Sequence, residues 1–156
     1  MKLIELTRGR FTMIDDEDFA LVSSSKWYCA GYAVRSHEGI RLYLHRVLLG
    51  LVAGDGIQVD HVDNDKLNNR RENLRVCTPA ENRRNCGKKA NNTSGFKGVF
   101  FRKGRALKKP WLAQIKVDKK SHYLGVFATA EEAACAYDTT ARELHGDFAL
   151  LNFEVE

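Results

Sequence analysis

Residues 59–82 constrain the fold of this chain more than any other stretch of its sequence. Two short runs that contain apolar residues, 59–61 and 74–77, flank a polar loop rich in Asn and Asp. Short runs of this kind, bounded by turn-forming residues, predict two strands. Thr78 then offers an N-cap, and Glu81 completes a capping box with it. The stretch therefore predicts a strand, a loop, a second strand and a helix in close succession.

The polar side chains of this stretch are of the kinds that phosphodiester hydrolysis requires. Asp60 and His61 are adjacent, Asn73 precedes the second strand, and Asn82 lies one turn inside the predicted helix. A histidine has an unperturbed pKa of about 6.5, so near neutral pH it can accept a proton from water. Carboxylate and amide oxygens are hard ligands suited to a divalent cation. A plain amide on a helix surface remains an alternative for Asn82.

The distribution of charge points to a polyanionic partner. The net charge is +5, and residues 88–125 hold eleven Lys and Arg but a single acid, Asp118. Residues 126–156 hold one Arg and seven acids. Aromatic residues lie between the positive charges, which favours nucleic acid over a membrane surface. A merely solvated basic surface is the alternative.

The basic region lies within a second predicted unit. Three strand-like runs occupy 96–102, 111–117 and 122–127. Thr129 then opens a helix with another capping box through Glu132, and Gly146 ends it. We expect a three-stranded antiparallel sheet with this helix packed across it, and the apolar tail at 149–153 packed back against that layer.

The N-terminal part predicts further short elements. Strands are expected within 1–14, at 26–35 and at 40–44, with short helices at 15–21 and 43–51. The predicted fold class is therefore α+β. We expect a nuclease-like domain at 1–87 with N-terminal strands, a linker at 88–94 that lacks large apolar residues, and a second domain at 95–156.

Composition excludes several other classes of protein. The four cysteines form no Cys-x-x-Cys pair, which argues against a zinc site or a disulfide framework. No apolar run approaches the roughly 20 residues of a membrane span. The first residues, MKLIELTRGR, lack the apolar core of a secretory signal. We therefore expect a cytoplasmic protein that is not secreted.

The spacing of Asp60-His61, Asn73 and Asn82 resembles that of the HNH nucleases, which are built on a ββα-metal finger. Leu44-His45-Arg46 upstream also suits the phage homing-endonuclease branch of that family. The resemblance implies that His61 is the general base, with Asn73 beside it in the catalytic set as the residue that bridges the loop. It implies that Asp60 and Asn82 bind Mg²⁺ or Mn²⁺. It also implies that the backbone leaves the first strand at Asp60-His61.

Residues 94–153 are similar to the plant apetala-two/ethylene-response-factor DNA-binding domain. The pieces that carry the similarity are FKGV at 96–99, WLAQI at 111–115, YLGVF at 123–127, TAEEAA at 129–134 and LNF at 151–153. In that family the sheet lies in the major groove, which implies DNA contacts from the strands. The implied contacts are Lys97, Arg102, Gln114, Lys116 and Tyr123. Phe100 stands where that family has an Arg, so the plant sequence preference does not carry over.

These features predict an HNH homing-type endonuclease that hydrolyses phosphodiester bonds in double-stranded DNA. Its products would carry 5′-phosphate and 3′-hydroxyl ends, and Arg70 and Arg83 would add DNA contacts near the finger. A DNA-binding regulator without catalysis is an alternative, and an RNA-directed protein is another. Other residues of interest are expected to have structural roles: Asn68 and Asn69 in the loop, His45, Trp27 and Tyr32 in packing, and Val99, Phe101, Ile115, Leu124 and Phe127 against the second helix.

Overall fold

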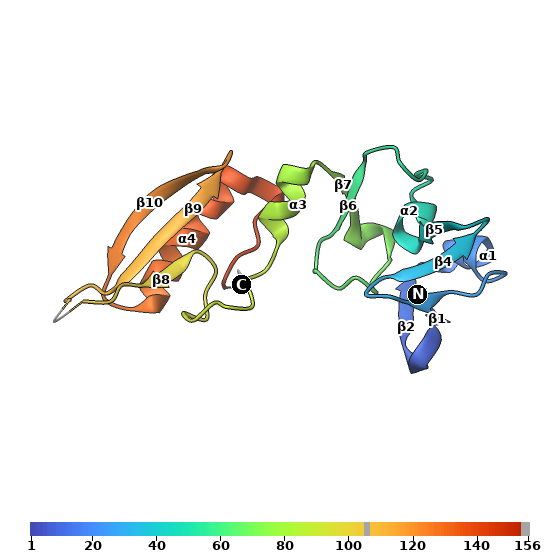
Figure 1. The fold of residues 1–156 in the computed structure, drawn as a ribbon, viewed down its shortest axis with the longest axis horizontal. Coiled ribbons are helices and arrows are strands. Elements are labelled where there is room, and N and C mark those ends of the chain that lie inside the picture. The colour runs from blue at the N-terminus through green and yellow to red at the C-terminus, as the bar shows by residue number, and fades with distance from the viewer. Residues whose placement is uncertain (105–106, 154–156) are drawn as a thin grey trace. The chain divides into compact units, whose positions relative to one another are not determined.

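The computed structural model describes residues 1–104 and 107–153 and has an α+β fold (Figure 1). The chain divides into two compact units, Met1–Asn82 and Arg83–Glu156. The boundary falls inside the helix α3 (Pro79–Asn85). None of the helices in the described ranges is long and apolar enough to cross a membrane.

The N-terminal unit begins with a hairpin whose apolar side chains enter the core. Strand β1 (Lys2–Glu5) pairs antiparallel with β2 (Phe11–Ile14) across the 3₁₀ turn η1 (Thr7–Gly9). The expected short helix follows as the 3₁₀ turn η2 (Asp16–Asp18) and the helix α1 (Phe19–Val22). The core of this unit includes Ile4, Leu6 and Ile14 from the hairpin, Val22 from α1, and Trp27 and Leu44 from later in the chain.

A second sheet contains β3 (Tyr28–Cys29), β4 (Ala33–His37) and β5 (Ile40–Tyr43), in that order. The single strand expected at 26–35 is wrong, because the chain turns at Gly31, whose φ of 78° suits glycine. The turn expected before β5 is confirmed, with Glu38 and Gly39 both at positive φ. Helix α2 (Leu44–Leu48) is shorter than expected and ends before Gly50.

The strand–loop–strand–helix unit is confirmed. Strand β6 (Gln58–His61) pairs antiparallel with β7 (Leu74–Cys77), the 3₁₀ turn η3 (Arg71–Asn73) enters β7, and α3 follows. The expected departure of the backbone from the strand at Asp60-His61 is wrong. Both residues remain paired, Asp60 with Arg75 and His61 with Leu74.

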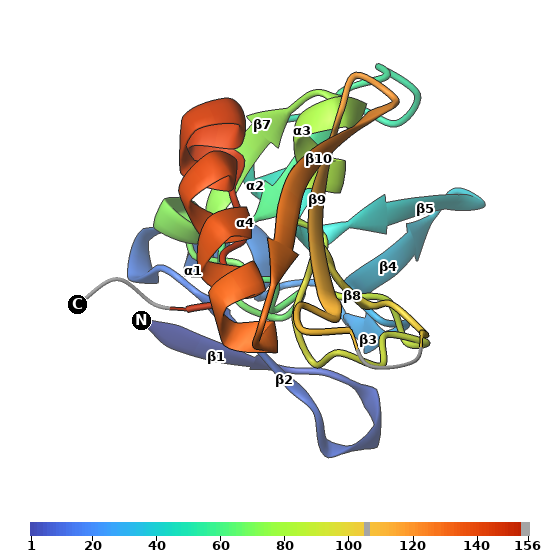
Figure 2. The same cartoon turned by 90° about the vertical axis from the view of Figure 1, so that its left-hand side faces the viewer.

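The C-terminal unit is the expected three-stranded antiparallel sheet with one helix. Strands β8 (Val99–Phe101), β9 (Trp111–Val117) and β10 (Lys120–Phe127) lie in the order β10-β9-β8. Helix α4 (Ala130–His145) lies along one face of this sheet (Figure 2). Thr129 and Glu132 form the expected capping box, and the helix ends at Gly146, where the turn η4 (Gly146–Phe148) begins. The small side chains of Ala133, Ala134 and Ala141 are fully buried against the sheet.

Strand β8 is shorter than predicted, and one of its side chains does not pack as predicted. Gly98, at a φ of 77°, lies so close to Tyr137 and to the backbone of Gln114 that any side chain would clash, so the regular strand begins after it. Phe101 was expected to pack against α4, but it is 52% exposed and packs edge-on against Trp111 instead. Phe101 is the last residue of β8 and pairs with Trp111, the first residue of β9, so it lies at the end of the sheet.

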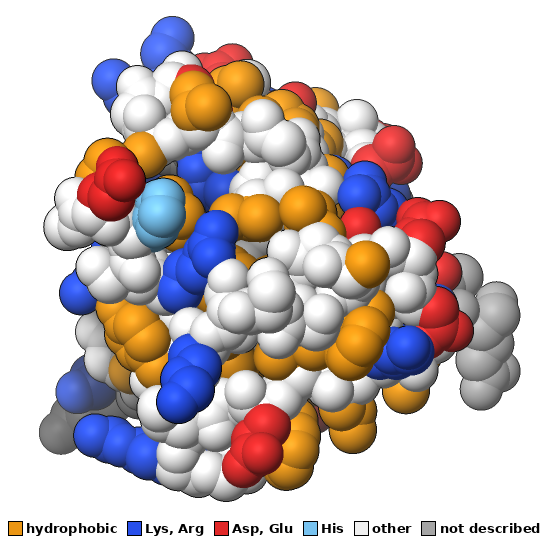
Figure 3. Space-filling view, turned by 90° about the vertical axis from the view of Figure 1, so that its right-hand side faces the viewer, with side chains coloured by type: hydrophobic (Ala, Val, Ile, Leu, Met, Phe, Trp, Pro, Cys, Tyr) orange, Lys and Arg blue, Asp and Glu red, His pale blue; other side chains and the backbone are white. Residues whose placement is uncertain are grey.

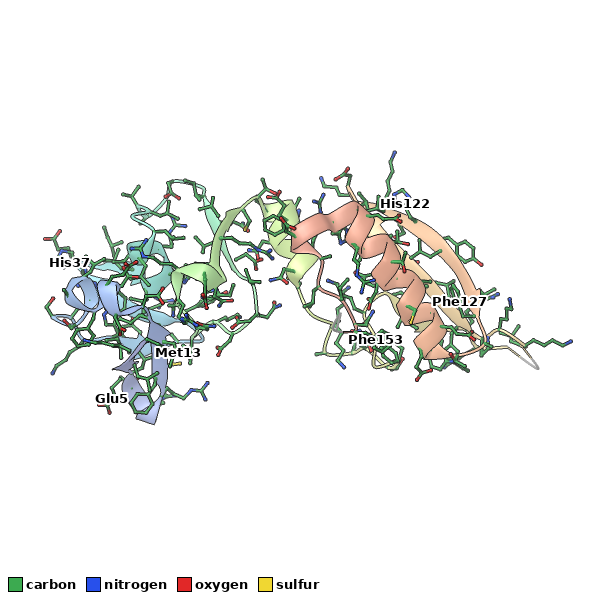
Figure 4. The ribbon with its side chains drawn as sticks, turned by 180° about the vertical axis from the view of Figure 1, so that it is seen from behind. Glu5, Met13, His37, His122, Phe127 and Phe153 are labelled. Carbon is green, nitrogen blue, oxygen red and sulfur yellow. The ribbon has the colours of Figure 1, made fainter. Side chains whose placement is uncertain are left out.

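The tail packs back as predicted. Asn152 accepts a hydrogen bond from the backbone of Lys97 and donates one to its carbonyl, while the buried Asp138 of α4 accepts from the backbone of Asn152. Phe153 lies beside Phe96, with ring centroids 5.5 Å apart (Phe153 is labelled in Figure 4). These contacts join the start of the sheet, the helix and the tail into one layer.

Candidate active site

Asp60 lies at the centre of the β6–β7 hairpin and is almost completely buried. Its cross-strand partner Arg75 donates two hydrogen bonds to Oδ2 of Asp60, 2.9 Å from Nε and 2.6 Å from a terminal nitrogen. A buried carboxylate is stable only when its charge is compensated. Arg75 supplies that compensation, and the strand register places it there.

Asn82 is placed next to the Asp60 face of the hairpin by α3. Thr78 begins that helix and forms the expected capping box with Glu81. Nδ2 of Asn82 donates a 2.9 Å hydrogen bond to Oε1 of Gln58. Gln58 precedes Asp60 by two residues on β6, so their side chains share one face of the strand. The structure therefore brings Asp60 and Asn82 to one side of the hairpin.

His61 is oriented by a chain of buried hydrogen bonds that reaches the N-terminal hairpin. The hydroxyl of Thr12 donates to the carbonyl of Leu67 at 2.7 Å, so its oxygen can accept from Nδ2 of Asn69, also at 2.7 Å. The amide oxygen of Asn69 is then turned toward Nε2 of His61, 3.3 Å away. Because an amide oxygen only accepts, Nε2 carries the proton and Nδ1 is the basic nitrogen of the ring.

Aromatic side chains cover the ring of His61. The ring of His45 lies edge-on to it, with centroids 5.2 Å apart, and Tyr32 lies 6.1 Å away. Burial lowers the pKa of His61 below its ordinary value, although Asn69 and nearby aspartates partly oppose this. Burial, with His61 and Arg46 nearby, lowers the pKa of His45 to about 4. Both imidazoles are therefore neutral near pH 7.

Asn73 holds the loop between the two strands. Its Oδ1 accepts from the backbone N–H of Asp63 at 3.0 Å, and its Nδ2 donates to the side chain of Asp63 and to the carbonyl of Asn68, each at 2.8 Å. The backbone of Asn64 adopts a positive φ of 62° inside this loop. The amide thus spans the loop and fixes its two ends.

The N-terminal hairpin is attached to the same loop. The backbone N–H of Met13 donates to Leu67, and that of Asn69 donates back to Met13, both at 2.8 Å. Arg70 pairs with Asp15, and Arg71 with the buried Asp18. Arg70, an expected DNA contact, therefore has ion-pair partners within the protein. The face of the molecule seen in Figure 3 carries side chains of both signs.

The expected DNA contacts of the second unit differ in accessibility. Lys97 donates from Nζ to the carbonyl of Arg84, and burial lowers its pKa to about 8. Lys116 and Tyr123 are exposed and Gln114 is half-buried. Arg102, which follows β8, is also exposed, as is Arg83 in α3. The structure thus separates Lys97 from the other candidates.

Sequence reasoning missed three residues of the site. Asn69 was taken as a loop former, yet it is fully buried and contacts His61. Its partner Thr12 is distant in sequence, and no local pattern announces the contact. Arg75 could have been found, because counting back along an antiparallel hairpin from the loop places it opposite Asp60.

Within residues 1–104 and 107–153, no cluster of three or more His, Cys, Asp or Glu could hold a metal ion. A divalent ion at this site would therefore depend on one carboxylate, one amide oxygen and ligands from outside the protein. Mg²⁺ is commonly held in this way, through one or two carboxylates and substrate phosphates. The residues present fit a hard divalent ion and do not fit zinc.

Comparison with known proteins agrees with this architecture. Residues 42–84 match a family model described as HNH endonuclease. The chain is 33% identical over 152 residues to an uncharacterised HNH endonuclease of Acanthamoeba polyphaga mimivirus, covering 93% of this chain and 76% of that protein. It is also 37% identical over 94 residues to Protein 3.8 of Escherichia phage T7, covering 60% of this chain and 74% of that protein.

A hairpin and helix with this set of residues define a nuclease of the ββα type. The chain belongs to the HNH endonuclease family. Its C-terminal region is separately similar to plant transcription factors. One example is an ethylene-responsive transcription factor of Arabidopsis thaliana, 47% identical over 66 residues, which cover 40% of this chain and 24% of that protein.

Proposed function

We propose that this nuclease hydrolyses double-stranded DNA with a divalent metal ion and with His61 as the general base. In this proposal the C-terminal sheet binds the duplex. The observation that carries the proposal is the Thr12–Asn69–His61 chain of hydrogen bonds. This chain holds a neutral imidazole in one tautomer, as a general base requires. A neutral imidazole in a fixed orientation therefore supports a catalytic role for His61.

His61 accepts the proton of the attacking water at Nδ1. The lowered pKa of His61 keeps this nitrogen unprotonated at neutral pH. His45 and Tyr32 limit the access of bulk water to one side of the ring. Asn69 retains the proton at Nε2 throughout, because its own amide nitrogen is held by Thr12.

Asp60 and Asn82 would hold Mg²⁺ or Mn²⁺. When bound, such an ion stabilises negative charge on the scissile phosphate and on the leaving 3′ oxygen. Arg75 holds the carboxylate of Asp60 in one orientation, and Gln58 does the same for the amide of Asn82. Asn73 keeps the loop closed, so its role in the catalytic set is to support geometry.

We assign cleavage and DNA binding to different domains. We place the nuclease domain at 1–87, the linker at 88–94 and the DNA-binding domain at 95–156. The basic residues of the second domain would supply affinity by releasing counterions from the duplex. Resemblance to phage homing endonucleases, together with relatives from a giant virus and a phage, supports a homing-type role and a cytoplasmic location.

A plasmid-nicking assay tests the proposed reaction. The purified chain should convert supercoiled DNA to nicked or linear forms with Mg²⁺ and should leave it intact in excess EDTA. The ends should carry 5′-phosphate and 3′-hydroxyl groups, which ligation of the products without prior treatment would show. Cleavage that persists in EDTA would remove the metal from the proposal.

Asn69→Ala should lower the cleavage rate by about 10–100-fold without changing the affinity for DNA. The substitution removes the amide oxygen that contacts Nε2 of His61, and a small misplacement of a catalytic group costs this much. Single-turnover cleavage and fluorescence anisotropy measure the two quantities. Thr12→Val, which removes the next bond in the chain at nearly constant volume, should have a smaller effect in the same direction. A folded Asn69→Ala protein with the wild-type rate would contradict the tautomer assignment.

Lys116→Met and Lys97→Met should affect DNA binding differently. Lys116 is exposed on the sheet, so its loss should flatten the dependence of log affinity on log salt by about one unit. The ammonium group of Lys97 already donates to Arg84, so its loss should leave the slope nearly unchanged. Binding measured at several salt concentrations separates the two variants. Equal slopes for both would show that burial does not decide which lysines contact phosphate.

A further inference from the structure

The face of the C-terminal sheet that points away from α4, called here the outer face, carries a defined order of side chains. Val99 and Ala113 are paired and fully buried against the helix. Their neighbours must therefore point to the outer face. Phe100 pairs with Leu112, and Leu112 pairs with Val126 on the other side. These three residues form one apolar row across all three strands, called here the apolar stripe.

The remaining rows of the outer face are polar. Gln114 pairs with Tyr123, and Lys116 pairs with Ser121. A bulge at Leu124 preserves this alternation. There Leu124 turns into the core beside Ala113, and Val126 returns to the outer face. The outer face therefore presents an apolar row, an amide beside a phenol, and an ammonium group, in that order along β9.

The apolar stripe is accessible. Phe100 is 46% exposed and Tyr123 is 64% exposed, while Leu112 and Val126 are half-buried. Among the described residues of this unit, no helix or strand covers the outer face (Figure 2). An exposed apolar row that crosses all three strands is typical of a surface that is covered when a partner binds.

Charge identifies the partner as a polyanion. Positive side chains flank the outer face at both ends of β9: Arg102, Lys103, Lys108 and Lys109 near the apolar stripe, and Lys116, Lys119 and Lys120 at the opposite end. An apolar protein surface would not match these positive charges. The major groove of duplex DNA admits strands of a sheet, with phosphates along both edges and base edges between them.

The base edges in the major groove include one apolar group, the methyl group of thymine. Resting on the proposed recognition of duplex DNA by this sheet, we propose that the apolar stripe contacts thymine methyl groups and that the adjacent Gln114 pairs with adenine. The amide of Gln matches the donor and acceptor of the adenine edge in this groove. The preferred substrate of the enzyme is therefore duplex DNA with A·T pairs under the apolar stripe and Gln114.

The test removes or adds only the methyl group. Binding of the full chain is measured in EDTA by fluorescence anisotropy. Two DNA duplexes contain alternating A·T pairs or alternating A·U pairs, in which uracil replaces thymine. Two others contain alternating G·C pairs, with cytosine either unmodified or methylated at C5. Each methyl group that the apolar stripe covers should strengthen binding by about fourfold. A·T should therefore bind more tightly than A·U, and methylated G·C more tightly than G·C.

Two variants link this preference to the apolar stripe. Phe100→Ser and Val126→Thr should each reduce the ratio of A·T to A·U affinity, because they replace apolar contact area with a hydroxyl group. Leu144→Ser is the matched control, since Leu144 is a comparably exposed apolar residue on α4, at 44% exposure. It should leave the ratio unchanged. Thermal melting of each variant shows that it is folded.

The outcomes separate this inference from the proposed function. Equal affinity for A·T and A·U duplexes would overturn the inference while leaving DNA binding intact. A difference between A·T and A·U without any gain on cytosine methylation would also overturn it, because duplex shape would then explain the preference. A chain that binds none of the duplexes at low salt would overturn the proposed recognition by the sheet as well.

Discussion

His61→Ala should lower the rate of DNA cleavage by about 10²–10⁴-fold while leaving the affinity for DNA nearly unchanged. The size follows from the loss of a general base. Affinity should persist because the basic residues of the second unit, which lie elsewhere in the chain, supply it. Single-turnover cleavage under saturating protein measures the chemical step, and anisotropy in EDTA measures binding.

His37→Ala is the matched control for His61→Ala. His37 is exposed at the end of β4, so removing it should change neither quantity. Added imidazole should partly restore cleavage by His61→Ala if the cavity left by the ring admits it. A His61→Ala protein that cuts at the wild-type rate would remove His61 from the mechanism.

Asp60→Asn should abolish cleavage at ordinary Mg²⁺ concentrations, and Asn82→Ala should raise the Mg²⁺ concentration needed for half-maximal rate. The carboxylate provides the only formal negative charge of the proposed ligand pair, so its neutralisation has the larger effect. Calorimetric titration with Mn²⁺ in the absence of DNA provides a measurement that does not depend on catalysis. Affinity for Mn²⁺ should fall in the order wild type, Asn82→Ala, Asp60→Asn.

Asp118→Asn is the control for Asp60→Asn, because Asp118 is an exposed aspartate in the turn between β9 and β10. Its Mn²⁺ titration should match the wild type. Asp60→Asn also leaves Arg75 with a weaker acceptor, so thermal melting must accompany the titration. An Asn82→Ala protein with an unchanged metal titration would show that this amide is not a ligand.

Local signals in the sequence predicted much of the fold. The starts of α3 and α4 were predicted from capping boxes, which are recognisable from four residues. The pairs are Thr78 with Glu81 and Thr129 with Glu132. Strand β9 was predicted with its observed bounds, 111–117. The start of strand β8 was not predicted, because it depends on the close approach of Tyr137 to Gly98. That contact joins residues far apart in the chain.

The same distinction applies to the candidate site. Asp60, His61, Asn73 and Asn82 lie within one local motif, so the resemblance of their spacing to that of the HNH nucleases identified them as candidates. The residues that orient them depend on long-range contacts, as Thr12 with Asn69 shows. Burial of Lys97 beneath Arg84 is likewise invisible in the sequence, where Lys97 is one basic residue among many. A local motif therefore predicts the candidate groups, while their electrostatic environment emerges only from tertiary structure.

The attachment of Thr12 to the loop of His61 bears on how such a nuclease can be moved between proteins. The region that matches the family model, residues 42–84, excludes β1 and β2. A graft limited to that region would carry the proposed catalytic histidine without the strand that holds its neighbour Asn69. A new DNA-binding domain can be joined at the C-terminal side of this enzyme without removing β2. A fusion that replaces the first fifteen residues removes β2, and with it Thr12. We therefore expect domain exchange to preserve activity at the C-terminal side of this nuclease and to abolish it at the N-terminal side.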